Sequence, residues 1–146
     1  MRKSFIVLLL ISAVLLMSCS SGGEIVDADI FIAAFEDAGL AISAVEYYTA
    51  ETDPYELLGR PGQYAQKVSF THTGEEEVEY CTIEIFKREK HANNREDYIN
   101  EIVENLPSSE QHIIKNSNYI MRLALSVTPE EVKQLEAAFN SVIDTE

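Results

Sequence analysis

Cys19 is the residue whose position in this chain implies the most specific chemistry, the covalent modification of its thiol. It follows an apolar run over residues 5–17, which is preceded by Arg2 and Lys3. A charged start, a short hydrophobic segment and a small residue before the cut site are the features that a secretory peptidase requires. We therefore expect residues 1–18 to be an export signal, after which Cys19 becomes the first residue of the mature chain.

The residues at the cut, Leu16-Met17-Ser18-Cys19, resemble the lipobox of bacterial lipoproteins. The resemblance implies that the thiol of Cys19 receives a diacylglycerol before cleavage and that the new amino terminus is then usually acylated, with palmitate as a typical chain. One lipid chain holds a protein only marginally, whereas two or three anchor it stably. The expected location is the extracytoplasmic face of the cell membrane, or the outer membrane in a Gram-negative host because Ser20 follows the cysteine.

The alternative for residues 5–17 is an uncleaved membrane helix. These thirteen residues fall short of the roughly 20 apolar residues that a helix needs to cross a bilayer. We therefore favour the lipid anchor, and we interpret the Ser- and Gly-containing residues that follow, up to residue 26, as a flexible tether between lipid and domain.

The most specific surface segment is Leu57-Leu58-Gly59-Arg60-Pro61-Gly62-Gln63-Tyr64. Its two glycines and its proline indicate a fixed turn that would present Arg60, Gln63 and Tyr64 together, and loops of this kind often carry function. A guanidinium beside an amide and a phenol could receive a carboxylate or a polar chain end. In the alternative, which we favour, the loop is a rigid connection in which Leu57, Leu58 and Tyr64 fill the edge of the core.

Other reactive side chains do not form a recognised constellation. Cys81 alternates with isoleucines in a strand-like run and is expected to be a buried small hydrophobe. The three histidines lack the close spacing of zinc sites, and the run Glu75-Glu76-Glu77 lacks the spacing of a calcium loop. No nucleophile elbow or phosphate-binding glycine loop is present. The sequence therefore predicts no enzyme activity, no metal site and no cofactor.

The charge of the chain limits its partners. The full chain has 25 acidic residues and 11 Lys and Arg, and loss of Arg2 and Lys3 with the signal leaves a mature charge of −16. Affinity for nucleic acid comes largely from Lys and Arg that neutralise phosphates, so a nucleic-acid partner is disfavoured. The acidity fits a cationic partner or, in the interpretation that we favour, the ordinary solubility of an exported domain.

Periodicity predicts the elements that position these residues. Helical spacing marks residues 27–38, 92–106 and 128–142, and alternation or apolar runs mark strands over residues 40–49, 67–73, 80–87, 111–115 and 119–127. Thr128-Pro129-Glu130-Glu131 has the pattern of a capping box with proline at the first helical position. Short turns at Gly74 and at Asn116-Ser117-Asn118 predict hairpins.

Because hairpins dominate, we predict an α+β domain with an antiparallel sheet of about five strands and three helices packed mainly on one face. The expected organisation is a signal peptide over residues 1–18, a lipidated cysteine and tether over 19–26, and one domain over 27–146. Beyond Cys19 the chain resembles a group of small exported bacterial proteins, mostly lipoproteins, without an assigned activity. That resemblance rests on Leu57 to Tyr64, Lys67-Val68-Ser69-Phe70, Ile83-Glu84-Ile85-Phe86, Arg95-Glu96-Asp97-Tyr98-Ile99, Arg122-Leu123 and Thr128-Pro129.

Three functional hypotheses follow. The leading one is a non-enzymatic, membrane-anchored domain that binds a protein or peptide partner in the cell envelope, through the Arg60 loop or an exposed sheet edge. The second is a lipoprotein that binds a small ligand for uptake or sensing. We rank it lower because a single layer of helices leaves little room for the pocket of some hundreds of cubic ångströms that such a protein needs. An envelope hydrolase or redox enzyme ranks last.

Overall fold

A computed structural model describes residues 25–72 and 80–145. The export signal, Cys19, most of the tether and the turn with Glu75, Glu76 and Glu77 lie outside the described residues. The elements run in the order α1 (Ala28–Asp37), β1 (Ile42–Tyr47), β2 (Gln66–His72), β3 (Cys81–Ile85), α2 (Glu89–Asn105), the short 3₁₀ helix η1 (Pro107–Ser109), β4 (His112–Asn116), β5 (Tyr119–Leu123) and α3 (Pro129–Ile143).

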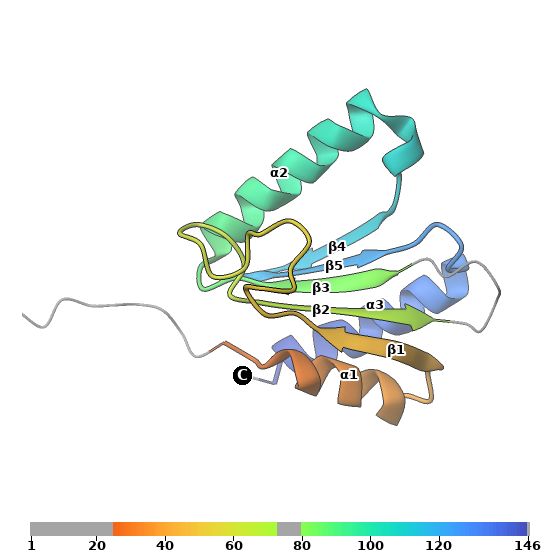
Figure 1. Cartoon of the computed structure of the whole chain (residues 1–146). Coiled ribbons are helices and arrows are strands. Elements are labelled where there is room, and N and C mark those ends of the chain that lie inside the picture. Colours follow the sequence, from red (N-terminus) through yellow and green to blue (C-terminus); the bar gives the residue numbers. More distant parts are fainter. Residues whose placement is uncertain (1–24, 73–79, 146) are drawn as a thin grey trace, which may run out of the picture.

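The five strands form one antiparallel sheet in the order β1-β2-β3-β5-β4. The helix α2 joins β3 to β4 at the edge of the sheet, and β5 returns between them (Figure 1). The predicted α+β class and the five-stranded antiparallel sheet are confirmed.

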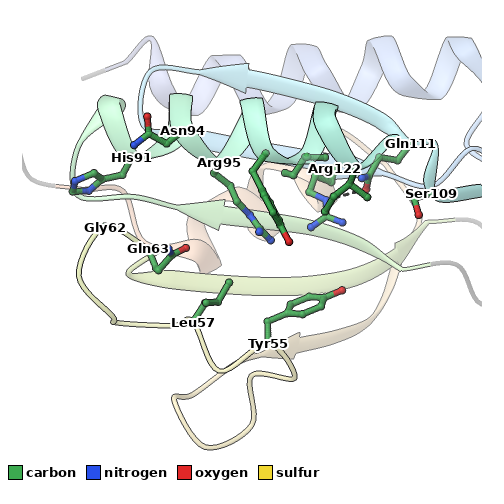
Figure 2. Close-up of a pocket in the computed structure, with 13 residues that line it drawn as sticks. Tyr55, Leu57, Gly62, Gln63, His91, Asn94, Arg95, Ser109, Gln111 and Arg122 are labelled. Carbon is green, nitrogen blue, oxygen red and sulfur yellow. Dashed lines mark hydrogen bonds between the residues drawn. The ribbon is translucent and has the colours of Figure 1, made fainter. Parts of the chain in front are cut away.

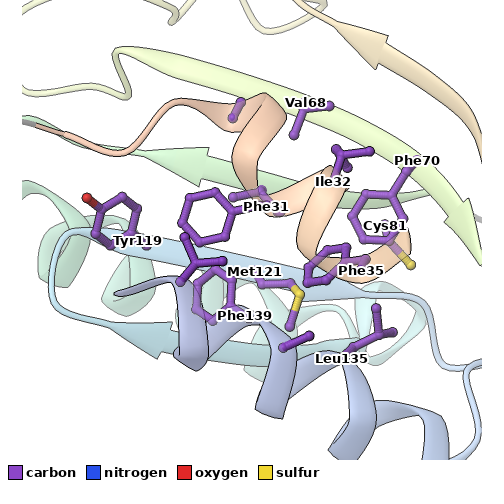
Figure 3. Packing of buried hydrophobic residues seen from close by; sticks show 14 of the residues in the cluster. Phe31, Ile32, Phe35, Val68, Phe70, Cys81, Tyr119, Met121, Leu135 and Phe139 are labelled. Atoms are coloured by element: carbon purple, nitrogen blue, oxygen red, sulfur yellow. The ribbon is translucent and has the colours of Figure 1, made fainter. Parts of the chain in front are cut away.

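The main core lies between one face of the sheet and the helices α1 and α3 (Figure 3). Strand alternation sends Val68 and Phe70 to this face together with every second residue of β3 and β5. Phe31 of α1 packs against Phe139 of α3 with ring centroids 5.2 Å apart. Val26, which we assigned to the tether, is also buried, and its N–H donates to Tyr119 Oη at 3.0 Å. Packing therefore extends beyond the predicted domain boundary at residue 27.

The helix α2 lies on the opposite face of the sheet from α1 and α3 (Figure 1). Two of the three helices thus share a face, as expected, and the third does not. Only Ala92 and Ile99 of α2 are buried, compared with four residues in each of α1 and α3. A small second core lies at one end of α2, formed by Tyr64, Phe86, Ala92 and Ile120. The expectation of a single layer of helices, which leaves little room for a ligand pocket, is therefore wrong.

Local signals in the sequence agree with the structure at the start of α3 and in the β4–β5 hairpin. Thr128 Oγ1 accepts a hydrogen bond from the N–H of Glu131, and Glu131 Oε2 accepts one from the N–H of Thr128, so the capping box is confirmed. In the β4–β5 hairpin Ser117 has a φ of 50°. The last strand is shorter than predicted, because it ends at Leu123 and the chain then turns with Val127 N–H donating to Ala124 O.

Candidate functional site

An open cleft of about 880 Å³ lies between α2, the loop that joins β1 to β2, and the sheet (Figure 2). The loop forms one wall, α2 forms the other, and side chains of β5 and of the segment before β4 complete it. Thirteen residues line this cleft, which we call the α2 cleft: Tyr55, Leu57, Gly62, Gln63, His91, Asn94, Arg95, Tyr98, Ile99, Ile102, Ser109, Gln111 and Arg122.

A buried carboxylate with two arginines forms the charged part of the cleft. The Glu84 side chain is 0% exposed, and Arg95 donates to it from Nε and Nη2, both at 2.8 Å. Arg122 donates from Nη1 to Glu84 Oε1 at 3.3 Å and from Nε to Gln111 Oε1 at 2.9 Å. Burial alone would lower the pKa of Arg95, but the hydrogen bonds and charge of Glu84 raise it, so the guanidinium is always charged. The hydrogen bonds to Glu84 and Gln111 hold both arginines in fixed orientations.

Strand alternation brings these groups together. Glu84 lies between Ile83 and Ile85, and Arg122 lies between Met121 and Leu123. Those four neighbours belong to the main core, so Glu84 and Arg122 point to the opposite face, under α2. Antiparallel pairing of β3 with β5 sets Glu84 opposite Ile120 and Thr82 opposite Arg122, which places the glutamate and the arginine on neighbouring strands.

Asp53 organises the loop wall of the cleft. Its Oδ2 accepts hydrogen bonds from Tyr64 Oη at 2.7 Å and from the N–H groups of Leu57 and Leu58 at 2.8 and 3.1 Å. Its Oδ1 accepts one from Lys67 Nζ at 2.9 Å. Burial alone would raise the pKa of Asp53, but these hydrogen bonds outweigh it and hold the pKa well below its usual range. The carboxylate is therefore charged at neutral pH. Its hydrogen bonds to Leu57, Leu58 and Tyr64 fix the conformation of the loop.

Tyrosine rings surround the buried Lys67. Its Nζ lies 4.5, 4.6 and 5.6 Å from the ring centroids of Tyr48, Tyr55 and Tyr64. Such contacts stabilise an ammonium group in addition to its ion pair. Burial and the negative charge of Asp53 raise the pKa of Tyr64, which stays a neutral donor. This cluster joins the loop to β2 and so holds Tyr55 in the wall of the cleft.

The α2 cleft differs in charge from the rest of the molecule. The chain has 25 Asp and Glu against 11 Lys and Arg, yet the lining contains two arginines, one histidine and no Asp or Glu. Tyr55 and Tyr98 stand about half exposed at the cleft, and the Arg95 guanidinium lies 5.7 Å from the Tyr98 ring centroid. The cleft therefore offers hydrogen-bond donors with positive charge beside aromatic surface.

The structure separates the three residues of the predicted binding loop. Gln63 lines the α2 cleft, whereas Tyr64 is fully buried under it with its hydroxyl bound to Asp53. The Arg60 side chain is 60% exposed, lies outside the lining and pairs with Glu56 at 3.3 Å. Tyr64, with the partly buried Leu57 and Leu58, thus fills the edge of the second core, as in the alternative interpretation of this loop.

The sequence predicts no site role for Asp53, Lys67, Glu84 or Arg122. Glu84 did carry a signal, since it is a charged residue that lies inside a strand between Ile83 and Ile85. Such a residue is almost never buried unless it is paired. The pairs themselves join residues far apart in the chain, so the pattern alone could not identify them.

Cys81 is buried in the main core, as predicted. His72 lies near the start of α3, where its Nε2 is 3.5 Å from Glu131 Oε1, and neither residue lines the α2 cleft. Within residues 25–72 and 80–145 no group of His, Cys, Asp and Glu has an arrangement that could hold a metal ion. No helix in these same two ranges has the length and apolar character needed to cross a membrane.

No family model, curated protein or solved structure matches this chain.

Proposed function

We propose that the protein is a non-catalytic binding lipoprotein of the cell envelope, anchored through lipid on Cys19 at the extracytoplasmic face of the membrane. Its α2 cleft holds a small ligand, for uptake or for sensing. The lipobox sequence supports the anchor, and the cleft is the observation that supports ligand binding. Its volume of about 880 Å³ falls in the range of roughly 300–1,000 Å³ that is typical of small-molecule sites.

The cleft changes the order of the two leading hypotheses. A protein or peptide partner is the leading hypothesis only if the helices leave little room for a pocket. Because α2 lies on the face opposite α1 and α3, room exists between α2 and the loop of residues 48–65. The Arg60 loop loses weight as a docking surface, since Tyr64 is buried and Arg60 lies on the surface outside the cleft.

Two substitutions on α2 test this proposal. Asn94 is exposed and lines the cleft (Figure 2), whereas Asn100 is exposed on the same helix and does not line it. Asn94→Trp should fill part of the cleft, and Asn100→Trp is the matched control. Ligand-observed NMR with a set of neutral, anionic and cationic fragments should show compounds that bind the unchanged protein and Asn100→Trp but not Asn94→Trp. The proposal fails if no fragment distinguishes the two variants.

A further inference from the structure

The charges around Glu84 sum to one net positive charge. Two guanidinium groups, those of Arg95 and Arg122, share the single carboxylate of Glu84. The other buried pair beside the cleft, Lys67 with Asp53, is neutral as a unit. Since none of the lining residues is acidic, the α2 cleft carries about one net positive charge, and a buried charge is costly unless it has a partner.

Both arginines keep a nitrogen available for a ligand. The hydrogen bonds to Glu84 and Gln111 engage Nε and Nη2 of Arg95 and Nε and Nη1 of Arg122. Nη1 of Arg95 and Nη2 of Arg122 take part in none of them, and both side chains point into the cleft in Figure 2. Their side chains are only 9% and 19% exposed, so an anion bound there would be shielded from water, where charge-assisted hydrogen bonds are strong.

The apolar part of the cleft indicates what is attached to the anion. Tyr98 lies beside Arg95, with its ring centroid 5.7 Å from the guanidinium, and Tyr55, Leu57, Ile99 and Ile102 add aromatic and aliphatic surface to the lining. Aromatic and aliphatic walls with a few placed polar groups are characteristic of sites for small, largely apolar ligands. A compact inorganic anion would leave this surface uncovered.

We infer that the ligand of the α2 cleft is a small monocarboxylate with an apolar or aromatic body. The carboxylate accepts hydrogen bonds from Arg95 and Arg122, and the body packs against Tyr55 and Tyr98. One negative charge balances the site. A phosphate, which carries close to two charges at neutral pH, would exceed that balance and would be repelled more strongly by a mature chain with a net charge of −16. The inference rests on the proposed function and adds the chemical class of the ligand.

The test uses pairs of small carboxylic acids and their primary amides, which have nearly the same shape and differ in charge. Phenylacetate with phenylacetamide and 4-phenylbutyrate with 4-phenylbutanamide are suitable pairs, and phenylphosphonate in mildly basic buffer supplies a dianion. Dissociation constants are measured by calorimetry on the full-length protein in detergent. We expect the better acid to bind at least about tenfold more tightly than its amide, the lower end of what a hydrogen bond to a charged group contributes.

Arg122→Gln should abolish the advantage of the acid over the amide. Arg60→Gln is the matched control, because it removes the same charge from an exposed position outside the cleft, and it should leave the advantage unchanged. Arg122→Lys keeps the positive charge and should retain part of the preference. Circular dichroism establishes that each variant is folded, so that a loss of binding can be assigned to the site.

Each result has a defined meaning. The inference is overturned if no acid binds more tightly than its amide, if phenylphosphonate binds best, or if Arg122→Gln and Arg60→Gln behave alike. If acids and amides bind equally well and neither binds Asn94→Trp, the α2 cleft binds ligands without selecting carboxylates. In that case only the inference fails. If Asn94→Trp excludes neither, the proposed function fails as well.

Discussion

At the scale of single residues, Asp53 is the group on which the wall of the cleft depends most. One buried carboxylate accepts hydrogen bonds from two backbone N–H groups, a phenol and an ammonium group. Hydrogen bonds to ionised groups are stronger than those between neutral groups. Removal of this one acceptor would leave several buried donors unsatisfied at once, and an unsatisfied buried group costs free energy.

Asp53→Asn should therefore destabilise the protein strongly. The substitution leaves the buried Lys67 ammonium without its counter-charge, and breaking a buried ion pair typically costs about 3–5 kcal/mol. Urea denaturation at neutral pH measures the change in the free energy of unfolding. Asp97→Asn is the control, because Asp97 is exposed on α2 and such changes usually stay within about 0.5 kcal/mol. Equal stability of the two variants would contradict the role given to Asp53.

The same carboxylate predicts how stability changes with pH. Hydrogen bonds hold the pKa of Asp53 below its ordinary value in the folded protein, whereas in the unfolded chain it lies near about 3.9. As the pH falls below that value, the unfolded state binds the proton first, and the free energy of unfolding decreases. Above it, the full contribution is present.

Denaturation curves at about pH 6 and about pH 3 measure this contribution. The unchanged protein should lose more stability between these two values than Asp53→Asn, which has no carboxyl group to protonate at this position. Parallel losses in the two proteins would show that the depressed pKa of Asp53 does not contribute to acid unfolding.

At the scale of elements, the three helices are held in different ways. The helices α1 and α3 each bury four apolar side chains in a continuous core. The longer α2 buries two and is joined to the sheet by the ion pair of Arg95 with Glu84. A helix with few buried apolar contacts is less stably attached to the rest of the fold. Because α2 packs less closely on the sheet, the space of the α2 cleft stays open beside it.

The capping box of α3 yields a prediction at this scale. Thr128→Ala removes the side chain that accepts from the N–H of Glu131, and loss of such a cap costs about 0.5–2 kcal/mol. Thr128→Ser keeps the hydroxyl and should remain close to the unchanged protein. Thermal unfolding of both variants measures the difference. If the serine variant unfolds as early as the alanine variant, the loss comes from the methyl group and not from the cap.

At the scale of the whole molecule, charge and anchor act together. The chain is acidic overall, while the lining of the α2 cleft is free of acidic side chains. An acidic surface gives little attraction to an anionic membrane. Under the proposed function, the lipid on Cys19 therefore holds the protein at the membrane, and the domain itself need not contact lipid.

Cys19→Ala should release the protein from membranes and abolish its labelling with a fatty acid. Cys81→Ala is the matched control, since Cys81 is buried in the main core and should have no part in anchoring. Cell fractionation with metabolic labelling measures both properties. Persistent membrane association and labelling of Cys19→Ala would exclude the lipobox interpretation.

The sequence by itself determined the fold class and most of the elements, because these follow from local periods and turn residues. Alternation in β2 and β3, helical spacing in α1 and the Thr128 capping box each depend on residues close together in the chain. The sequence also carries the lipobox, on which the proposed anchor rests.

Only the tertiary structure decided on which face α2 lies, and the α2 cleft depends on that choice. The helical stripe of α2 contains Arg95 as well as Ile99 and Ile102, and an arginine packs inward only where a buried partner meets it. That partner is Glu84, on a different element and 11 residues away in sequence. Arg122 reaches the same carboxylate from a position 38 residues away. Contacts over such separations leave no periodic signal, so the site became visible only in the folded chain.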